Sequence, residues 1–411
     1  MRHFIAVDAL VLLSELGVAV VVPWWITTHS GAAAMASYGV AIALATLVAT
    51  PLLSPFGDRH CKATQITAGL AVLMASFLGL AVCALQKQFS LPAVIGLALA
   101  TVLADAIVSP ARSAIVAELV PADHLPAALQ IQKTCRSLSG VLGPVLAGAA
   151  LAGIGVAPAL FACAAGIALA LALSLRIGRQ PTAERARSGL AAWWRELHAG
   201  IAGKWKIPME RGWTVVNFFV WIFQGPAVGM LIPIKVHSLG LSGQWMGLAL
   251  GALSVGTLIG SLFSSRLLVH HFGRYKVRLG LGAFEGACLA AVGLSTSPVL
   301  LVLGLLMAGI CNASMSLVGA THRALAIPRN YRVRMLAATS VTTQAAGALG
   351  PALVGFALTS LSVNVVYGGF GLLMATCAMG LALVPRLKEF LSLEHTEVVD
   401  WYSRQYPHVF P

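Results

Sequence analysis

The chain has 411 residues, of which 58% are hydrophobic and 10% charged, and its mean hydropathy is +0.86. This composition excludes a soluble globular domain, in which roughly 25% of residues are charged. The formal charge of +13 would indicate nucleic acid in a soluble protein. In a membrane protein, basic residues instead set the orientation of the chain, so no nucleic-acid partner is expected.

Apolar runs of roughly 20 residues, the length of a bilayer-spanning helix, follow one another along the chain. The first half has runs near residues 4–27, 33–56, 64–85, 91–118, 127–152 and 155–176. The second half has runs near residues 212–236, 244–268, 277–296, 298–323, 333–359 and 363–385. The first run exceeds the roughly 7 to 15 residues of a signal-peptide core, so we interpret it as a transmembrane helix. The sequence therefore predicts an all-α membrane protein with twelve transmembrane helices.

One long polar interruption divides these helices into two sets of six. It contains an amphipathic run, residues 190–197, that is typical of a helix lying at the membrane surface. We therefore predict a six-helix bundle at 1–176, a cytoplasmic linker with an interfacial helix at 177–211, a second six-helix bundle at 212–385 and a cytoplasmic tail at 386–411. The sequence suggests no function for the tail.

A glycine-proline motif in the fifth helix of the first half recurs in the fifth helix of the second, 207 residues later. The motif consists of Gly140, Gly143, Pro144 and Gly148, and its copy of Gly347, Gly350, Pro351 and Gly355. Because each half has an even number of spans, the halves share one topology and form parallel repeats. Small residues at this spacing let helices approach closely, and ordinary helix packing is the alternative to a specific role in transport.

The distribution of basic residues predicts the orientation. With the N-terminus in the cytoplasm, only Lys87 and Lys235 of the 27 Lys and Arg residues lie on the opposite side. This asymmetry follows the positive-inside rule and predicts that both termini are cytoplasmic.

The loop after the second predicted helix reads Ser54-Pro-Phe-Gly57-Asp58-Arg59-His60-Cys61-Lys62. It resembles the motif Gly-x-Leu-Ala-Asp-Arg-x-Gly-Arg-Arg/Lys of the major facilitator superfamily, although Ser54 and Cys61 replace two glycines. The stretch from Ser109 to Ala128 resembles the branch of that superfamily that contains enterobactin exporters and macrolide efflux proteins.

The resemblance implies alternating access between two bundles and a cytoplasmic gate in the matching loop. In that family the loop acid contacts the start of the eleventh helix and a base in the fourth. The gate residues implied here are Asp58, Arg59, Lys62 and Arg112.

Four acids lie at membrane depth, where an ionised side chain costs about 2.5 to 3.5 kcal/mol on insertion scales. They are Asp8, Glu15, Asp105 and Glu285. Asp8 and Glu15 are seven residues apart and share a helix face, as do Asp105 and Arg112. We expect these acids to carry protons or line a cavity, and the resemblance favours Glu15 and Asp105 over Glu285. The alternative is that each acid pairs with a buried base such as Arg112, Lys133 or Arg136.

Polar and aromatic residues on the seventh and tenth helices are candidates for a substrate cavity. They are Asn217, Trp221, Gln224, Asn312 and His322. The first three fall at i, i+4 and i+7 on one helical stripe. Hydrogen bonding between helices is the alternative role for these side chains.

The sequence contains no Walker A, HExxH, CxxC or GxSxG motif. We therefore expect neither an enzyme nor a cofactor or metal site. The predicted function is proton-antiport export of a small organic molecule, a siderophore or drug-like compound, by a monomer in the bacterial inner membrane. Its expected partners are the substrate, protons and membrane lipids. The alternatives are transport of lysophospholipids or other lipids and, in another class, a polytopic membrane enzyme or non-transporting sensor.

Overall fold

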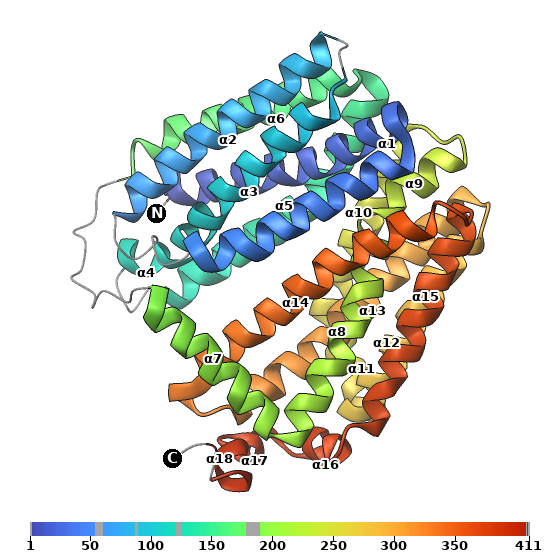
Figure 1. The fold of residues 1–411 in the computed structure, drawn as a ribbon. Coiled ribbons are helices and arrows are strands. Elements are labelled where there is room, and N and C mark those ends of the chain that lie inside the picture. Colours follow the sequence, from blue (N-terminus) through green and yellow to red (C-terminus); the bar gives the residue numbers. More distant parts are fainter. Residues whose placement is uncertain are drawn as a thin grey trace. The chain divides into compact units, whose positions relative to one another are not determined.

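The computed structural model describes residues 2–53, 61–86, 89–120, 125–177, 190–407 and 409. Throughout these ranges the regular elements are helices, with no β-strand (Figure 1). The chain forms two compact units: unit 1 comprises residues 1–190 and 236–251, and unit 2 comprises residues 191–235 and 252–411. The prediction of an all-α membrane fold is confirmed.

The helices of unit 1 begin with α1 (Arg2–Leu53), which merges the first two predicted spans. The two parts meet at Gly31, whose φ of 73° suits glycine because it has no Cβ to clash with the backbone. The other helices are α2 (Lys62–Leu85), α3 (Leu91–Ala114), α4 (Val116–Leu119), α5 (Leu125–Gly153) and α6 (Val156–Ser174).

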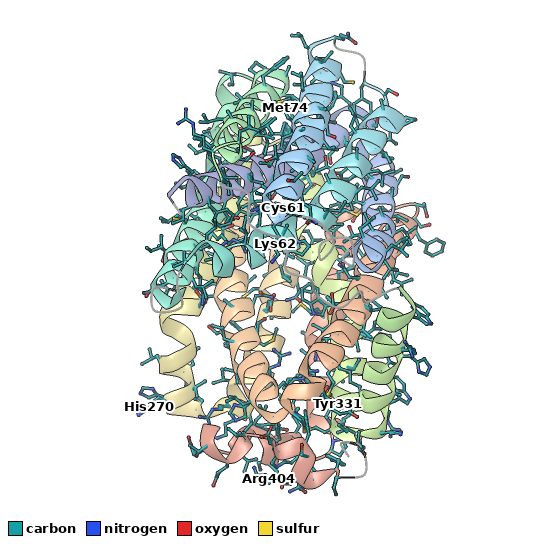
Figure 2. All side chains as sticks on the ribbon, turned by 90° about the vertical axis from the view of Figure 1, so that its left-hand side faces the viewer. Cys61, Lys62, Met74, His270, Tyr331 and Arg404 are labelled. Carbon is teal, nitrogen blue, oxygen red and sulfur yellow. The ribbon has the colours of Figure 1, made fainter. Side chains whose placement is uncertain are left out.

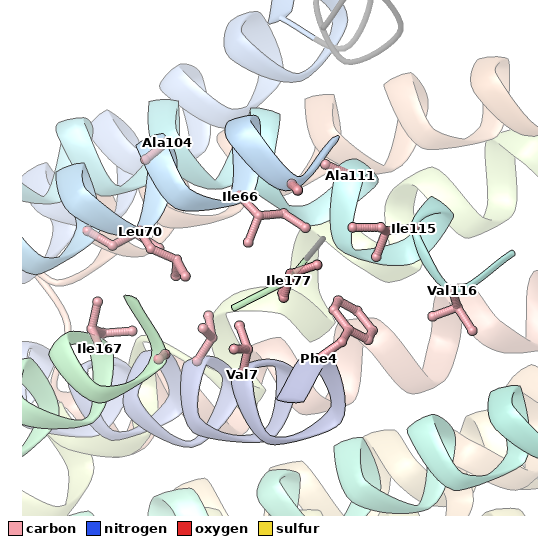
Figure 3. Close-up of a cluster of buried hydrophobic side chains, with 14 of the residues drawn as sticks. Phe4, Val7, Ile66, Leu70, Ala104, Ala111, Ile115, Val116, Ile167 and Ile177 are labelled. Carbon is pink, nitrogen blue, oxygen red and sulfur yellow. The ribbon is translucent and has the colours of Figure 1, made fainter. Parts of the chain in front are cut away.

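Apolar side chains from α1 to α6 form the core of unit 1, with alanines as the members from α3 and α5 (Figure 3). Phe4 and Val7 of α1 meet Ile66 and Leu70 of α2 and Ile167 of α6. All five side chains are almost inaccessible to solvent. This apolar cluster packs α1 and α3 in one core. The same two helices carry charged residues that are described below.

The helices from α7 to α15 lie mainly in unit 2. They are α7 (Leu190–Lys206), α8 (Pro208–Val228), α9 (Leu231–Ser238), α10 (Gly243–Ile259), α11 (Ser265–Phe272), α12 (Arg274–Leu294), α13 (Pro298–Ala326), α14 (Arg329–Ala357) and α15 (Val363–Met379). A π turn (Gly260–Ser264) joins α10 to α11. The amphipathic α7 lies where the interfacial helix is predicted.

The described ranges contain nine helices that are long and apolar enough to cross a membrane, with α1 counted once. Division of α1 at Gly31 gives a tenth span. The pair α8 and α9, bent by 40°, gives an eleventh. The 29-residue α14 is the remaining predicted span, and polar residues within it such as Thr342, Thr343 and Gln344 make it less apolar than the others. The helix order therefore matches the twelve predicted spans.

The C-terminal tail folds against one end of unit 2 as three short helices, α16 (Leu387–Ser392), α17 (His395–Val398) and α18 (Trp401–Gln405) (Figure 1). Phe390 and Tyr402 are fully buried in a core that also contains Trp213 of α8. The tail is thus an integral part of this unit. The predicted domain bounds stay a prediction, and most of the linker's first part, residues 178–189, lies outside the described ranges.

Candidate functional site

Asp8 is the centre of a buried charge cluster in unit 1. Its side chain is 1% exposed, yet it accepts hydrogen bonds from three other side chains. Arg112 Nε of α3 and Arg136 Nε of α5 each donate to one carboxylate oxygen at 2.8 Å. Gln132 Nε2 donates at 3.1 Å. For Asp8, therefore, the structure shows the pairing with Arg112 and Arg136 that the sequence left as an alternative.

Glu15 lies two turns further along the same face of α1. Its Oε2 accepts from Arg112 Nη1 at 3.5 Å, whereas its Oε1 is buried and has no hydrogen-bond partner among the described residues. Asp105 of α3 is partly buried and interacts electrostatically with Arg112, but none of the described ion pairs includes it. Arg112 is thus shared among three acids.

The charges of this cluster do not balance. Asp8, Glu15 and Asp105 supply three negative charges, and Arg112 and Arg136 supply two positive ones. Lys133 of α5, another candidate base, is exposed and forms none of the described ion pairs. An excess negative charge at low dielectric is unfavourable, and one bound proton would remove it. The cluster is therefore suited to binding and releasing one proton.

The predicted gate lies mostly outside the described residues. Asp58 and Arg59 are among residues 54–60, which the structure does not describe, and Lys62 is the first residue of α2 (Figure 2). The fourth member, Arg112, forms its described ion pairs with Asp8 and Glu15. The contact between Asp58 and Arg112 stays a prediction.

Unit 2 contains a second buried acid, Glu285 of α12, which is inaccessible to solvent. Its Oε1 accepts from Gln224 Nε2 of α8 at 2.5 Å and from Asn312 Nδ2 of α13 at 3.2 Å. Its Oε2 is buried without a hydrogen-bond partner. The structure thus brings together three of the candidate residues on three helices. Gln224 and Asn312 are engaged in the hydrogen bonding between helices that was the alternative to substrate binding, whereas none of the described ion pairs gives Glu285 the basic partner that was its alternative.

Asn217 and Trp221 of α8 line a cavity of about 160 Å³ in unit 2. Arg278 of α12, which the sequence analysis did not single out, lines the same cavity and donates to Asn217 Oδ1 at 2.9 Å. His322 lies elsewhere: its Nε2 is 3.1 Å from the Leu393 carbonyl oxygen in the tail. Asn217 and Trp221 are therefore the predicted cavity residues that the structure places on a cavity wall.

A further polar cluster, also not foreseen, surrounds Glu210 at the start of α8. Arg323 binds both oxygens of this fully buried carboxylate, at 2.8 and 2.6 Å. Tyr402 of the tail donates to Oε1 at 2.5 Å, and Lys204 of α7 lies 4.0 Å from Oε2. Burial and the neighbouring Glu210 carboxylate raise the pKa of Tyr402 well above its usual value. Burial, reinforced by repulsion from Arg323, lowers the pKa of Lys204 to about 8.

The duplicated glycine motif contains positions of two kinds. A Cβ atom at Gly143 would come within 2.9 Å of a side chain of α1, and one at Gly350 within 2.6 Å of the Ile222 carbonyl oxygen in α8. A Cβ at Gly140 or Gly347 would meet open space. Within each copy, the second glycine therefore permits close helix packing, whereas a larger residue would fit at the position of the first.

The family profile described as Major Facilitator Superfamily matches residues 6–284 and 216–397. The chain belongs to the major facilitator superfamily. As a superfamily member it is a multi-pass membrane transporter and not an enzyme, and the predicted superfamily membership is confirmed.

Among proteins of known function, this superfamily member is similar in sequence to exporters. It is 28% identical over 406 residues to the enterobactin exporters EntS of Salmonella typhimurium and Salmonella paratyphi A, covering 95% of this chain and 92% of each relative. The predicted likeness to the enterobactin-exporter branch is therefore confirmed.

Solved transporters share the fold of this superfamily member. A peptide transporter POT in complex with sulfate superposes with a TM-score of 0.73 at 14% identity, covering 95% of both chains. The nucleoside transporter NupG gives 0.71 at 14% identity, covering 93% of this chain and 98% of its own. A bacterial homolog of the human lysosomal transporter Spinster, inward-facing and unoccupied, gives 0.64 at 15% identity, covering 97% and 96%.

Proposed function

We propose that this transporter exports a small organic molecule, a siderophore or drug-like compound, in exchange for protons. It works by alternating access as a monomer in the bacterial inner membrane, with both termini in the cytoplasm. Export is supported by the 28% identity to enterobactin exporters over 95% of the chain. Proton coupling is supported by the charge cluster of unit 1, and this cluster is the observation that carries the proposal.

The chemistry of coupling follows from the sharing of Arg112. When Glu15 and Asp105 are both ionised, they compete for this guanidinium with Asp8, which already binds it at 2.8 Å. A proton on Glu15 or Asp105 removes the excess charge and leaves Arg112 to the remaining carboxylates. Access of water from the other side of the membrane favours the ionised acid again and releases the proton. The substrate leaves on the opposite half of the cycle.

The cytoplasmic gate in this proposal is the loop with Asp58, Arg59 and Lys62. A carboxylate at a helix N-terminus is favoured by the helix dipole, so Asp58 would hold the cytoplasmic side closed. Asp58→Asn then slows cycling without changing substrate affinity. An equal loss of affinity would contradict the gate assignment.

The test of the proposed function compares accumulation in cells that do or do not produce the protein. A panel of radiolabelled siderophores and fluorescent drug-like cations is measured before and after an uncoupler collapses the proton gradient. We expect the protein to lower the accumulation of some compounds, and the uncoupler to abolish this effect. Accumulation that does not depend on the protein for any compound would contradict export of this class, and exclusion that survives the uncoupler would contradict proton coupling.

Variants of the acids separate coupling from folding. Asp105→Asn or Glu15→Gln removes the excess charge permanently, and we expect transport by these variants to lose its pH dependence. Glu285→Gln keeps pH-dependent transport, because Glu285 belongs to the separate hydrogen-bonded group in unit 2. Glu389→Gln, at an exposed pair with Arg386 in the tail, is the matched control. pH-dependent transport in the first two variants would count against the cluster as the proton site.

A further inference from the structure

Arg278 is a buried cation that forms no ion pair with any carboxylate in the described part of the chain. It is 6% exposed, and its Nη1 and Nη2 donate to the Met315 carbonyl oxygen at 2.8 Å and to Asn217 Oδ1 at 2.9 Å. Its Nε is buried and makes no hydrogen bond, and none of the described ion pairs includes this guanidinium. A buried guanidinium of this kind is expensive unless an anion compensates it.

The charges around Arg278 do not balance. Arg278 and Arg323 both line the cavity of about 160 Å³, and Lys204 and Glu210 border Arg323. Glu285 interacts electrostatically with Arg278 from two turns further along α12, where Gln224 and Asn312 hold it by hydrogen bonds. These three cations and two carboxylates leave a surplus of one positive charge beside the cavity.

The same cavity has a second unused polar group. Thr214 Oγ1 of α8 is buried and has no hydrogen-bond partner among the described residues. The same is true of Arg278 Nε, and both residues line the cavity. Both atoms carry hydrogens that they can donate. Two donors without a partner among the described residues, beside a positive surplus, suit a ligand that offers negatively charged acceptor oxygens.

The remaining walls are aromatic, and the volume limits the ligand. Trp221 is 39% exposed, and Phe218 lies on the same wall. The ring centre of Trp213 lies 5.7 Å from the Arg278 guanidinium and 5.1 Å from the Arg323 guanidinium. Pockets for drug-sized molecules measure roughly 300 to 1,000 Å³, so a cavity of about 160 Å³ has room for one ring and its charged group.

We propose that this cavity binds an aromatic carboxylate or a similar ring-bound oxyanion, with Arg278 and Thr214 as its hydrogen-bond donors. The anionic ring is one end of the exported molecule, and this identification rests on the proposed function. Anionic aromatic compounds are then favoured substrates, in contrast to the cationic compounds that many drug panels contain.

The test measures binding of sodium benzoate to the purified full-length protein in nanodiscs by saturation-transfer NMR titration. Benzamide has the same ring without the charge and is the comparison ligand. We expect saturable binding of benzoate and binding of benzamide that is about tenfold weaker or more, as for the loss of a charge-assisted hydrogen bond. Equal affinity for the two ligands, or no saturable binding, would overturn the proposal.

Variants locate the site. Arg278→Gln is expected to weaken benzoate binding by about tenfold or more, whereas Arg278→Lys restores part of the affinity because it keeps the charge. Lys276→Gln, which removes an exposed charge from the same helix, is expected to have no effect. Thr214→Val is nearly isosteric, so it tests the site if Arg278→Gln fails to fold. Benzoate affinity that is unchanged in both Arg278→Gln and Thr214→Val would overturn the proposal.

The binding assay needs no gradient and no transport. Benzoate binding by a protein that fails the export test would leave the anion site in place and contradict the proposed function. Gradient-driven export without any Arg278-dependent benzoate binding would support the proposed function and contradict the anion site.

Discussion

Replacement of Tyr402 by phenylalanine tests how the tail is held against unit 2. The Tyr402 hydroxyl donates to Glu210 Oε1 at 2.5 Å, and both residues are inaccessible to solvent. Phenylalanine keeps the stacking on Phe390, whose ring centre is 5.9 Å away. A hydrogen bond to a charged group contributes about 1.5 to 3 kcal/mol. With about 1.4 kcal/mol for each tenfold change, the undocked tail becomes roughly 10 to 150 times more populated.

Hydrogen exchange of the tail amides measures this change directly. In the regime where exchange follows the opening equilibrium, peptides covering residues 386–407 of Tyr402→Phe exchange faster by the same factor. Tyr406→Phe is the matched control, because the Tyr406 hydroxyl interacts with Arg386 at a partly exposed position, and the ring keeps its packing on Trp401 at 6.2 Å. An exposed contact contributes at most about 1 kcal/mol, so the control accelerates exchange by less than about fivefold. Wild-type exchange in Tyr402→Phe, or equal acceleration in both variants, would refute the reasoning.

Two further predictions concern unit 2. Lys204 has a pKa lowered to about 8 from 10.5, so the folded protein disfavours its charged form. Wild-type stability then rises as pH increases from about 8 to 10.5. Lys204→Met removes the titrating group, so scanning fluorimetry should show that this rise in melting temperature between about pH 8 and 10.5 is lost. A rise of the same size in the variant would contradict this. Gly350→Ala forces a Cβ against a backbone oxygen and destabilises the protein by about 1 to 3 kcal/mol, whereas Gly347→Ala is tolerated. Equal melting temperatures for these two alanine variants would show that the close approach at Gly350 is not required.

The membrane made most of the fold predictable from the sequence. Because each span must satisfy its backbone hydrogen bonds internally and cross a fixed thickness, length and hydropathy locate the helices without tertiary information. Of the predicted helical stripe on α8, Asn217 and Trp221 line one cavity, whereas Gln224 donates to Glu285. The two helices within α1 meet at Gly31, which lies in the gap between the predicted spans at 4–27 and 33–56.

The polar groups of unit 2 were harder to predict. Arg278 lies in a run of basic residues that membrane orientation already explains, so composition gave no reason to place it on a cavity wall. Glu210 lies just before a predicted span, where a charged residue is ordinary. The burial of Phe390 and Tyr402 in the tail depends on the surface that α8 and α13 form together. Such pairings are properties of the folded unit and not of any one segment.

Proton movement driven by a substrate gradient tests the central claim most directly. The wild-type protein is reconstituted into liposomes that contain a pH-sensitive dye, and an outward gradient of an exported compound is imposed. The account predicts substrate-dependent acidification of the lumen as protons enter in exchange, and loss of this signal in Glu15→Gln or Asp105→Asn while folding is retained. Substrate efflux without any pH change in the wild-type protein would contradict proton antiport.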